Sequence, residues 1–174
     1  MFTVADARRF AIELFTQSAM LKTQRRSSLL LDADVLLQRF INKPRAWLFA
    51  HDDADISSIR EAFCAAVKRR CTGLPIAYIT GEKDFWGLSF HVTPDVLIPK
   101  PDTELLVERS LAIVREKAAA LPPDRPFFIL DPCTGSGCVA ISLLHTLEAE
   151  GIKNSSCIAI DISPAALAIA RTNA

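Results

Sequence analysis

The sequence predicts an α/β protein with three parts: a small N-terminal helical bundle, a β-hairpin linker and a parallel β-α-β unit. Apolar residues recur at helical spacing up to about residue 70. After Gly73 this pattern gives way to turn residues and aromatics, and an apolar run at 127–130 then leads into a glycine-rich turn. We therefore expect domains at 1–72, 73–98 and 99–174.

The helical part contains several segments with an apolar face. The first is indicated by apolar residues from Ala7 to Leu14. A second follows with Ser27 or Ser28 as its N-cap and ends at Asn42. We expect Trp47, Leu48 and Phe49 to form one short buried turn.

The last helix of this part contains Ile59, Phe63 and Val67, with Ser58 and Glu61 at capping-box spacing. It ends in three basic residues, 68–70, which suit the negative end of a helix, and Gly73 follows as a stop. Such a basic triplet is more often a helix end than a binding site.

Residues 74–101 lose helical periodicity, and Phe85 to Val92 have the partial alternation and aromatic content of a β-hairpin. Because flexible linkers are poor in aromatics, we expect this linker to be packed and ordered, with His91 in a structural role. A helix then begins with Asp102 or Thr103 as cap, and its end is marked by three prolines, Pro122, Pro123 and Pro126.

The β-α-β unit starts with Phe127 to Leu130, a continuous apolar run typical of a parallel strand buried on both faces. Gly135 and Gly137 follow, and their lack of Cβ atoms allows unusual backbone angles and close approach of a ligand. A helix to about Glu150 directs its free N–H groups toward that ligand. A second strand at 156–160 and a last helix capped by Ser163 complete the unit.

Asp161 follows the second strand, 26 positions beyond Gly135. A carboxylate there can accept hydrogen bonds from both hydroxyls of a ribose. The turn lacks the third glycine of a pyrophosphate-binding motif, so a nucleoside without phosphates fits better, and S-adenosylmethionine is the obvious candidate. The alternative is an ordinary β-α-β turn in which the glycines serve only chain geometry.

Composition limits the possible functions. The net charge is zero: residues 1–72 hold 12 Lys and Arg against 8 Asp and Glu, and residues 73–174 hold 8 against 12. This asymmetry is too weak to predict nucleic-acid binding. Five scattered cysteines without a C-x-x-C pair support neither disulfides nor a metal site. The charged N-terminus and the lack of a long apolar run predict a cytoplasmic protein without a membrane segment.

Four stretches together closely resemble the HemK/PrmC family, the protein-glutamine methyltransferases that modify peptide chain release factors. They are G-L-P-I-A-Y-I-T-G-E-K-D-F-W-G-L (73–88), V-T-P-D-V-L-I-P-K-P-D-T-E-L-L-V-E (92–108), D-P-C-T-G-S-G-C-V-A-I (131–141) and D-I-S-P-A-A-L-A-I-A-R-T-N-A (161–174). The resemblance implies an N-terminal substrate-recognition domain, a hairpin linker and the first part of a Rossmann-like methyltransferase domain. It also implies S-adenosylmethionine as methyl donor and the glutamine of a G-G-Q tripeptide in a release factor as acceptor.

By the same resemblance, Asp161 binds the ribose of the cofactor, and Asp131 is a supporting carboxylate near its methionine end. The glycine-rich turn that matches the family's cofactor loop consists of Cys133, Thr134, Gly135, Ser136 and Gly137. Two departures are visible. The family usually has leucine and glycine where this chain has Pro132 and Cys133, and arginine where it has Lys100.

The family's acceptor-binding motif, N-P-P-Y, does not occur in the 174 residues, so no catalytic residue is predicted here. We expect a truncated chain that transfers no methyl group by itself. Alternatives are a catalytically inactive fragment, a release-factor-binding module, or a methyltransferase acting on a ribosomal protein glutamine. A nucleic-acid amino-methyltransferase shares the N-P-P-Y chemistry, but the basic groove it needs is not evident.

Overall fold

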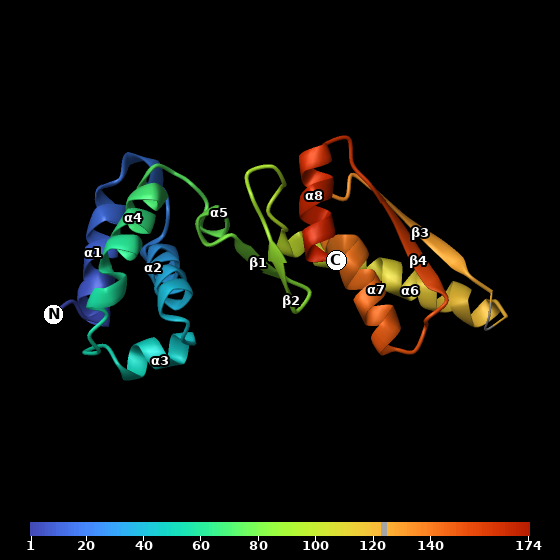
Figure 1. Ribbon diagram of the computed structural model, residues 1–174, viewed down its shortest axis with the longest axis horizontal. Coiled ribbons are helices and arrows are strands. Elements are labelled where there is room, and N and C mark those ends of the chain that lie inside the picture. The colour runs from blue at the N-terminus through green and yellow to red at the C-terminus, as the bar shows by residue number, and fades with distance from the viewer. Residues whose placement is uncertain (123–124) are drawn as a thin grey trace. The chain divides into compact units, whose positions relative to one another are not determined.

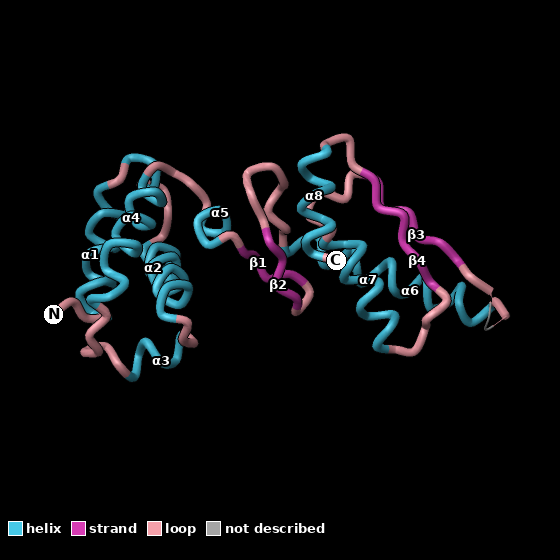
Figure 2. Tube along the Cα trace, viewed as in Figure 1, coloured by secondary structure: helices cyan, strands magenta, loops and turns pink. Residues whose placement is uncertain are grey.

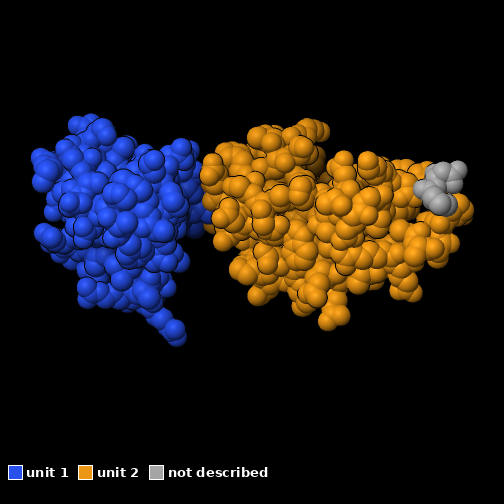
Figure 3. All heavy atoms as spheres, turned by 90° about the horizontal axis from the view of Figure 1, so that it is seen from below, with its two compact units in different colours: residues 1–80 blue, residues 81–174 orange. Residues whose placement is uncertain are grey.

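The computed structural model describes residues 1–122 and 125–174, which form two compact units (Figure 3). The first unit comprises Met1–Thr80 and the second Gly81–Ala174. The hairpin therefore lies in the second unit, and the predicted ranges 1–72, 73–98 and 99–174 do not coincide with the compact units. Their functional meaning stays a prediction. No helix among the described residues is long and apolar enough to cross a membrane.

The first unit is helical throughout, as predicted (Figure 1). Its α-helices are α1 (Val4–Gln17), α2 (Arg26–Ile41), α3 (Arg45–Ala50), α4 (Arg60–Cys71) and α5 (Ile76–Thr80). Single 3₁₀ turns at Ala19–Leu21 and Ser57–Ile59 connect some of them. Helix α5 lies in the stretch 74–101, where the sequence shows no helical periodicity, because a five-residue helix is too short to show it.

The helix ends are where the prediction failed most often. Neither Ser27 nor Ser28 caps α2, which begins at Arg26 without a side-chain cap. Ser58 lies in a 3₁₀ turn that precedes α4, so the expected capping box with Glu61 does not form. The capping box is instead at α1, where the Thr3 hydroxyl accepts from Asp6 N and the Asp6 carboxylate accepts from Thr3 N, each at 3.1 Å.

The core of the first unit is formed by the apolar faces of α1, α2 and α4, together with Leu48 of α3. Fully buried side chains include Phe15, Phe63 and Leu37. The turn at 47–49 was expected to be buried, but Phe49 is 61% exposed. A helix of six residues buries one face only, and here that face carries Leu48.

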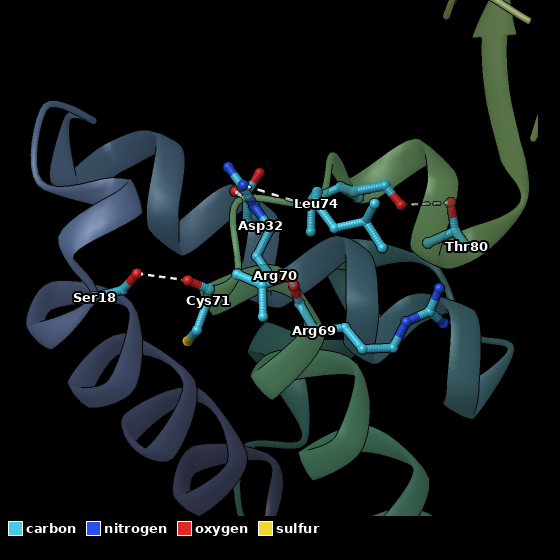
Figure 4. A network of polar contacts seen from close by, with 9 residues as sticks. Ser18, Asp32, Arg69, Arg70, Cys71, Leu74 and Thr80 are labelled. Atoms are coloured by element: carbon cyan, nitrogen blue, oxygen red, sulfur yellow. Dashed lines mark hydrogen bonds and ion pairs between the residues drawn. The ribbon is translucent and has the colours of Figure 1, made fainter. Parts of the chain in front are cut away.

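A polar network fixes the C-terminal end of α4 (Figure 4). The Arg70 Nε donates to Asp32 Oδ2 of α2 at 2.8 Å, and both side chains are largely buried. The Ser18 hydroxyl, just after α1, donates to the Cys71 carbonyl oxygen at 2.8 Å. Arg70 is thus a buried partner of α2 as well as a residue of the basic helix end, and the network joins α4 to α1 and α2.

The described part of the second unit contains the hairpin strands, a parallel strand pair and three α-helices (Figure 2). In chain order the elements are β1 (Glu82–Phe85), β2 (Leu88–His91), α6 (Glu104–Ala120), β3 (Phe127–Pro132), α7 (Cys138–Ala149), β4 (Ser155–Ile160) and α8 (Pro164–Asn173). A 3₁₀ turn at Pro101–Thr103 precedes α6, so neither Asp102 nor Thr103 caps it with a side-chain hydrogen bond. Pro123 lies outside the described residues.

The hairpin is antiparallel and ordered, as predicted. Its two-residue turn is Trp86-Gly87, and both residues have positive φ, 53° and 72°. Two positive φ angles are typical of a type I′ turn, whose twist matches that of the strands. Phe85 and Phe90 pack edge to face in the core beside Val107 and Leu111 of α6, so the hairpin belongs to the second unit's core.

Strands β3 and β4 pair in parallel, which confirms the predicted β-α-β unit. The prediction that residues 127–130 are buried on both faces is wrong for this structure. Phe127 and Ile129 pack under the helices, whereas the alternate face exposes large apolar side chains. The large apolar side chains on this exposed face are Phe128 (68% exposed), Leu130 (60%), Ile158 (50%) and Ile160 (50%). Within the part of the chain that the structure describes, helices cover one face of this strand pair.

Loss of the Arg70–Asp32 contact should destabilise the first unit. An Arg70→Ala substitution leaves Asp32 without its cationic partner, which we expect to lower the free energy of unfolding by about 3 kcal/mol. Urea denaturation of the chain measures this. The neighbouring Arg69 is exposed, and Arg69→Ala is the matched control with an expected change near zero. Equal stabilities of the two variants would contradict the assigned role of Arg70.

Candidate functional site

The glycine-rich turn follows β3 directly and begins α7. Its backbone takes positive φ at Cys133 (66°), Gly135 (55°) and Gly137 (80°), as the two glycines had predicted. Thr134 N donates to the Ile160 carbonyl oxygen at 2.9 Å, and Gly137 N donates to the Thr134 carbonyl oxygen at 2.9 Å. The turn is therefore closed on itself and attached to the end of β4.

The polar side chains of the turn point into the protein. Thr134 and Ser136 are buried, with 6% and 2% of their surfaces exposed. The Thr134 hydroxyl donates to Asp131 Oδ2 at 2.7 Å. Cys133, by contrast, is exposed. The exposed surface of the turn is thus formed by its backbone and by Cys133.

Asp161 lies beside the turn, at the end of β4. Its Oδ2 accepts from Gly135 N at 2.9 Å, and its Oδ1 accepts from Ser163 N at 2.9 Å. These backbone N–H groups, that of Ser163 first, hold the pKa of Asp161 below its ordinary value. A carboxylate offers about four acceptor positions, so the bonds to Gly135 N and Ser163 N leave capacity for a further donor.

The two glycines of the turn face different surroundings. A Cβ built on Gly135 would meet no atom within 4 Å, so this side of the turn is open. A Cβ on Gly137 would lie 2.9 Å from Ile141 Cδ1 and 3.3 Å from Ala170 Cβ. Gly137 therefore allows α8 to approach α7, whereas Gly135 faces open space.

A groove of about 260 Å³ lies between α7 and α8 over the inner face of β4. It contacts the turn only at Gly137, and its other lining residues are largely apolar, among them Leu144, Cys157 and Leu167. The predicted site residues Cys133 to Ser136 and Asp161 do not line it. The structure thus separates this groove from the open side of the turn.

The hairpin is attached to the helices beside the turn. Trp86 Nε1 donates to the Thr146 hydroxyl of α7 at 3.0 Å, and Trp86 N donates to Glu104 of α6 at 2.9 Å. Asn173 of α8 bonds both His91 and the Ser136 carbonyl oxygen. The sequence did not predict Asn173 as a site residue, because these partners are far from it along the chain.

The cysteines show no sign of a metal site. All five are free, and no cluster of three or more His, Cys, Asp or Glu side chains that could hold a metal ion occurs within residues 1–122 and 125–174. Burial raises the pKa values of the Cys138 and Cys157 thiols, which keeps them protonated at neutral pH. They behave as small apolar side chains.

Comparison with known proteins supports the resemblance. The family model of the PrmC N-terminal domain matches residues 15–81. The chain is 42% identical over 148 residues to the release factor glutamine methyltransferase of Haemophilus influenzae, with 83% of this chain and 50% of that protein covered. The enzymes of the same name from Coxiella burnetii and Escherichia coli are 46% and 35% identical, with 83% and 82% of this chain and 48% and 47% of theirs covered.

Over the residues it spans, the chain belongs to the HemK/PrmC family. It spans about half the length of the curated relatives it matches.

Cys133 is a departure with a visible physical consequence. The resemblance to the HemK/PrmC family implies glycine at this position, and the structure places Cys133 in the left-handed region at φ 66°. A side chain in that region costs about 1–2 kcal/mol. The turn is closed despite this cost, through its bonds to β4 and Asp161.

Alanine at the two glycines should separate their roles. We expect Gly137→Ala to lower the free energy of unfolding by about 2–4 kcal/mol, because backbone strain adds to a clash with Ile141 and Ala170. Gly135→Ala introduces the backbone strain without a clash, so we expect it to lower the free energy of unfolding by about 1 kcal/mol. Thermal and urea unfolding of both variants provide the measurement, and a Gly135→Ala loss as large as that of Gly137→Ala would contradict the packing role of Gly137.

The contact between Asp161 and Gly135 should persist well into acid. Because the folded-state pKa of Asp161 is lowered, its contribution is fully present above the ordinary aspartate pKa of about 3.9 and is lost as pH falls through the lower folded value. An NMR titration of the Gly135 amide should therefore show no transition between pH 7 and 5. Asp161→Asn should abolish the acid transition, and a midpoint above pH 4 in the wild type would contradict the assignment.

Proposed function

We propose that this chain carries the cofactor site of an enzyme that transfers a methyl group from S-adenosylmethionine to the side-chain amide of the G-G-Q glutamine in a peptide chain release factor. The observation that carries the proposal is the hydrogen bond between Asp161 and Gly135. It places an ionised acceptor beside an open glycine turn at the carboxyl ends of two parallel strands.

The residues present fit a nucleoside cofactor. The open side of Gly135 accommodates a ligand against the backbone, and the free acceptor capacity of Asp161 suits a ribose hydroxyl. Asp131, oriented by Thr134, is available for the amino acid end of the cofactor. When bound, S-adenosylmethionine supplies the electrophilic methyl group, while the chain holds and orients it.

The acceptor follows from the family rather than from this chain's geometry. The relatives compared above are named release factor glutamine methyltransferases, which supports a release factor over a ribosomal protein as partner. We include in the proposal that the helical residues 1–72 recognise this partner and that the protein acts in the cytoplasm. The proposal includes no binding to a nucleic acid or to a membrane.

A ribose contact of Asp161 can be separated from its support of the turn. We expect a cofactor analogue lacking the ribose 2′-hydroxyl to bind the wild-type chain roughly tenfold more weakly than S-adenosylmethionine, because a hydrogen bond to a carboxylate is lost. In the Asp161→Asn variant, the difference in affinity between S-adenosylmethionine and the analogue should be much smaller. Isothermal titration calorimetry of all four combinations gives the coupling.

Glu148 of α7 is exposed and serves as the matched acidic control. In Glu148→Gln the preference for the hydroxylated cofactor should equal that of the wild type. If Asp161→Asn also retains the full preference, the ribose assignment fails, even if that variant binds both ligands more weakly.

Methyl transfer itself tests the whole proposal. Labelled S-adenosylmethionine and a release factor containing G-G-Q are incubated with the 174-residue chain and, separately, with a longer protein that adds the N-P-P-Y segment. We expect glutamine labelling by the longer protein only, since positioning of the acceptor can supply roughly 7 kcal/mol or more of barrier reduction. Equal labelling by both would place acceptor binding within residues 1–174. Labelling by neither would contradict the proposed function.

A further inference from the structure

We infer that Asn173 is a positioning residue that couples the β1–β2 hairpin to the glycine-rich turn, so that the two move as one body. Its side-chain amide makes three hydrogen bonds to these two segments. Oδ1 accepts from His91 N at 2.8 Å, and Nδ2 donates to the His91 carbonyl oxygen at 3.0 Å and to the Ser136 carbonyl oxygen at 2.8 Å.

The Asn173 side chain bonds the backbone of His91 in β2 as a neighbouring strand would. Val92 N bonds the Gly81 carbonyl oxygen, and because hydrogen-bonded and non-bonded pairs alternate along an antiparallel ladder, the pair of Glu82 and His91 is non-bonded. Both backbone groups of His91 therefore point away from β1. Asn173 satisfies them together.

The contact with Ser136 fixes a peptide plane of the turn. In a trans peptide the C=O and the following N–H point in opposite directions. Asn173 holds the Ser136 carbonyl oxygen, and the Gly137 N–H on the other edge donates to the Thr134 carbonyl oxygen at 2.9 Å. The Ser136–Gly137 plane is thus held from both sides.

Residues at the two ends of helix α8 both bond to the glycine-rich turn. Asp161, just before α8, holds the Gly135 N–H, and Asn173, in the last turn of α8, holds the Ser136 C=O. Only an amide side chain can serve at position 173, since His91 requires one acceptor and one donor and Ser136 requires a second donor. A displacement of the hairpin is therefore transmitted to the turn.

Amide hydrogen exchange of the full chain, measured by NMR, tests the coupling directly. In Asn173→Ala we expect amide exchange at His91 and Gly137 to accelerate roughly tenfold. The His91 N–H loses its acceptor, and the peptide plane that contains the Gly137 N–H loses its bond at the Ser136 carbonyl oxygen. Lys83 lies in the hairpin ladder away from Asn173, and its exchange should not change. Thr172→Ala, which removes only an exposed bond to the Ala168 carbonyl oxygen in the same helix, is the matched control without effect.

A second variant guards against simple misfolding. Asn173→Asp has the same size and keeps an acceptor for His91 N, but it loses both donors, so Gly137 exchange should accelerate more than His91 exchange. Uniform acceleration that includes Lys83 would indicate general destabilisation and overturn the inference. Unchanged exchange at Gly137 in both variants would also overturn it.

The bearing of this coupling on catalysis rests on the proposed function. If the turn binds S-adenosylmethionine, Asn173→Ala should weaken that affinity roughly fivefold to tenfold in calorimetry, and Thr172→Ala should not. Absence of binding by the wild-type chain would contradict the proposed function alone, because the exchange experiment decides the role of Asn173 without any ligand. Wild-type affinity in Asn173→Ala would contradict the positioning role.

Discussion

The hydrogen bond from the Gly135 N–H to the Asp161 carboxylate is the interaction on which the candidate site depends. It joins the segment after β3 to the segment after β4, across 26 positions of sequence. The same carboxylate accepts from Ser163 N, immediately before α8, so one charged group sets the turn, the end of β4 and the start of a helix. The parallel pairing of β3 and β4 brings these groups together, because it places both strand ends at one edge.

Charged side chains have a comparable structural role in the first unit. Arg70 joins the end of α4 to α2 through Asp32. On another side of α2, the buried Asp34 accepts from Arg8 at 2.7 Å and from Arg45 at 2.9 Å. Two carboxylates of α2 thus form ion pairs with arginines of α1, α3 and α4. Three arginines of the basic region 1–72 are therefore paired with carboxylates inside this unit.

Local patterns predicted the strands, the hairpin and the turn, because apolar runs and glycine spacing determine the structure of the same few residues in which they occur. The helix N-caps at Ser27 or Ser28 and at Ser58 were wrong, since a preceding residue or a 3₁₀ turn occupies the start of the helix. The contacts of Asn173 span 82 and 37 positions, and nothing in the local sequence marks them. The role of Cys133 as a left-handed residue was visible only as a departure from the family's glycine.

We propose that the open side of the glycine-rich turn, with Asp161, is the cofactor site. Titration of the isotope-labelled chain with S-adenosylmethionine, followed by amide chemical shifts, tests it most directly. We expect saturable shifts centred on Cys133 to Gly137, Asp161 and Ser163. Shifts confined to the groove between α7 and α8, around Leu144 and Leu167, would contradict it and place the ligand elsewhere.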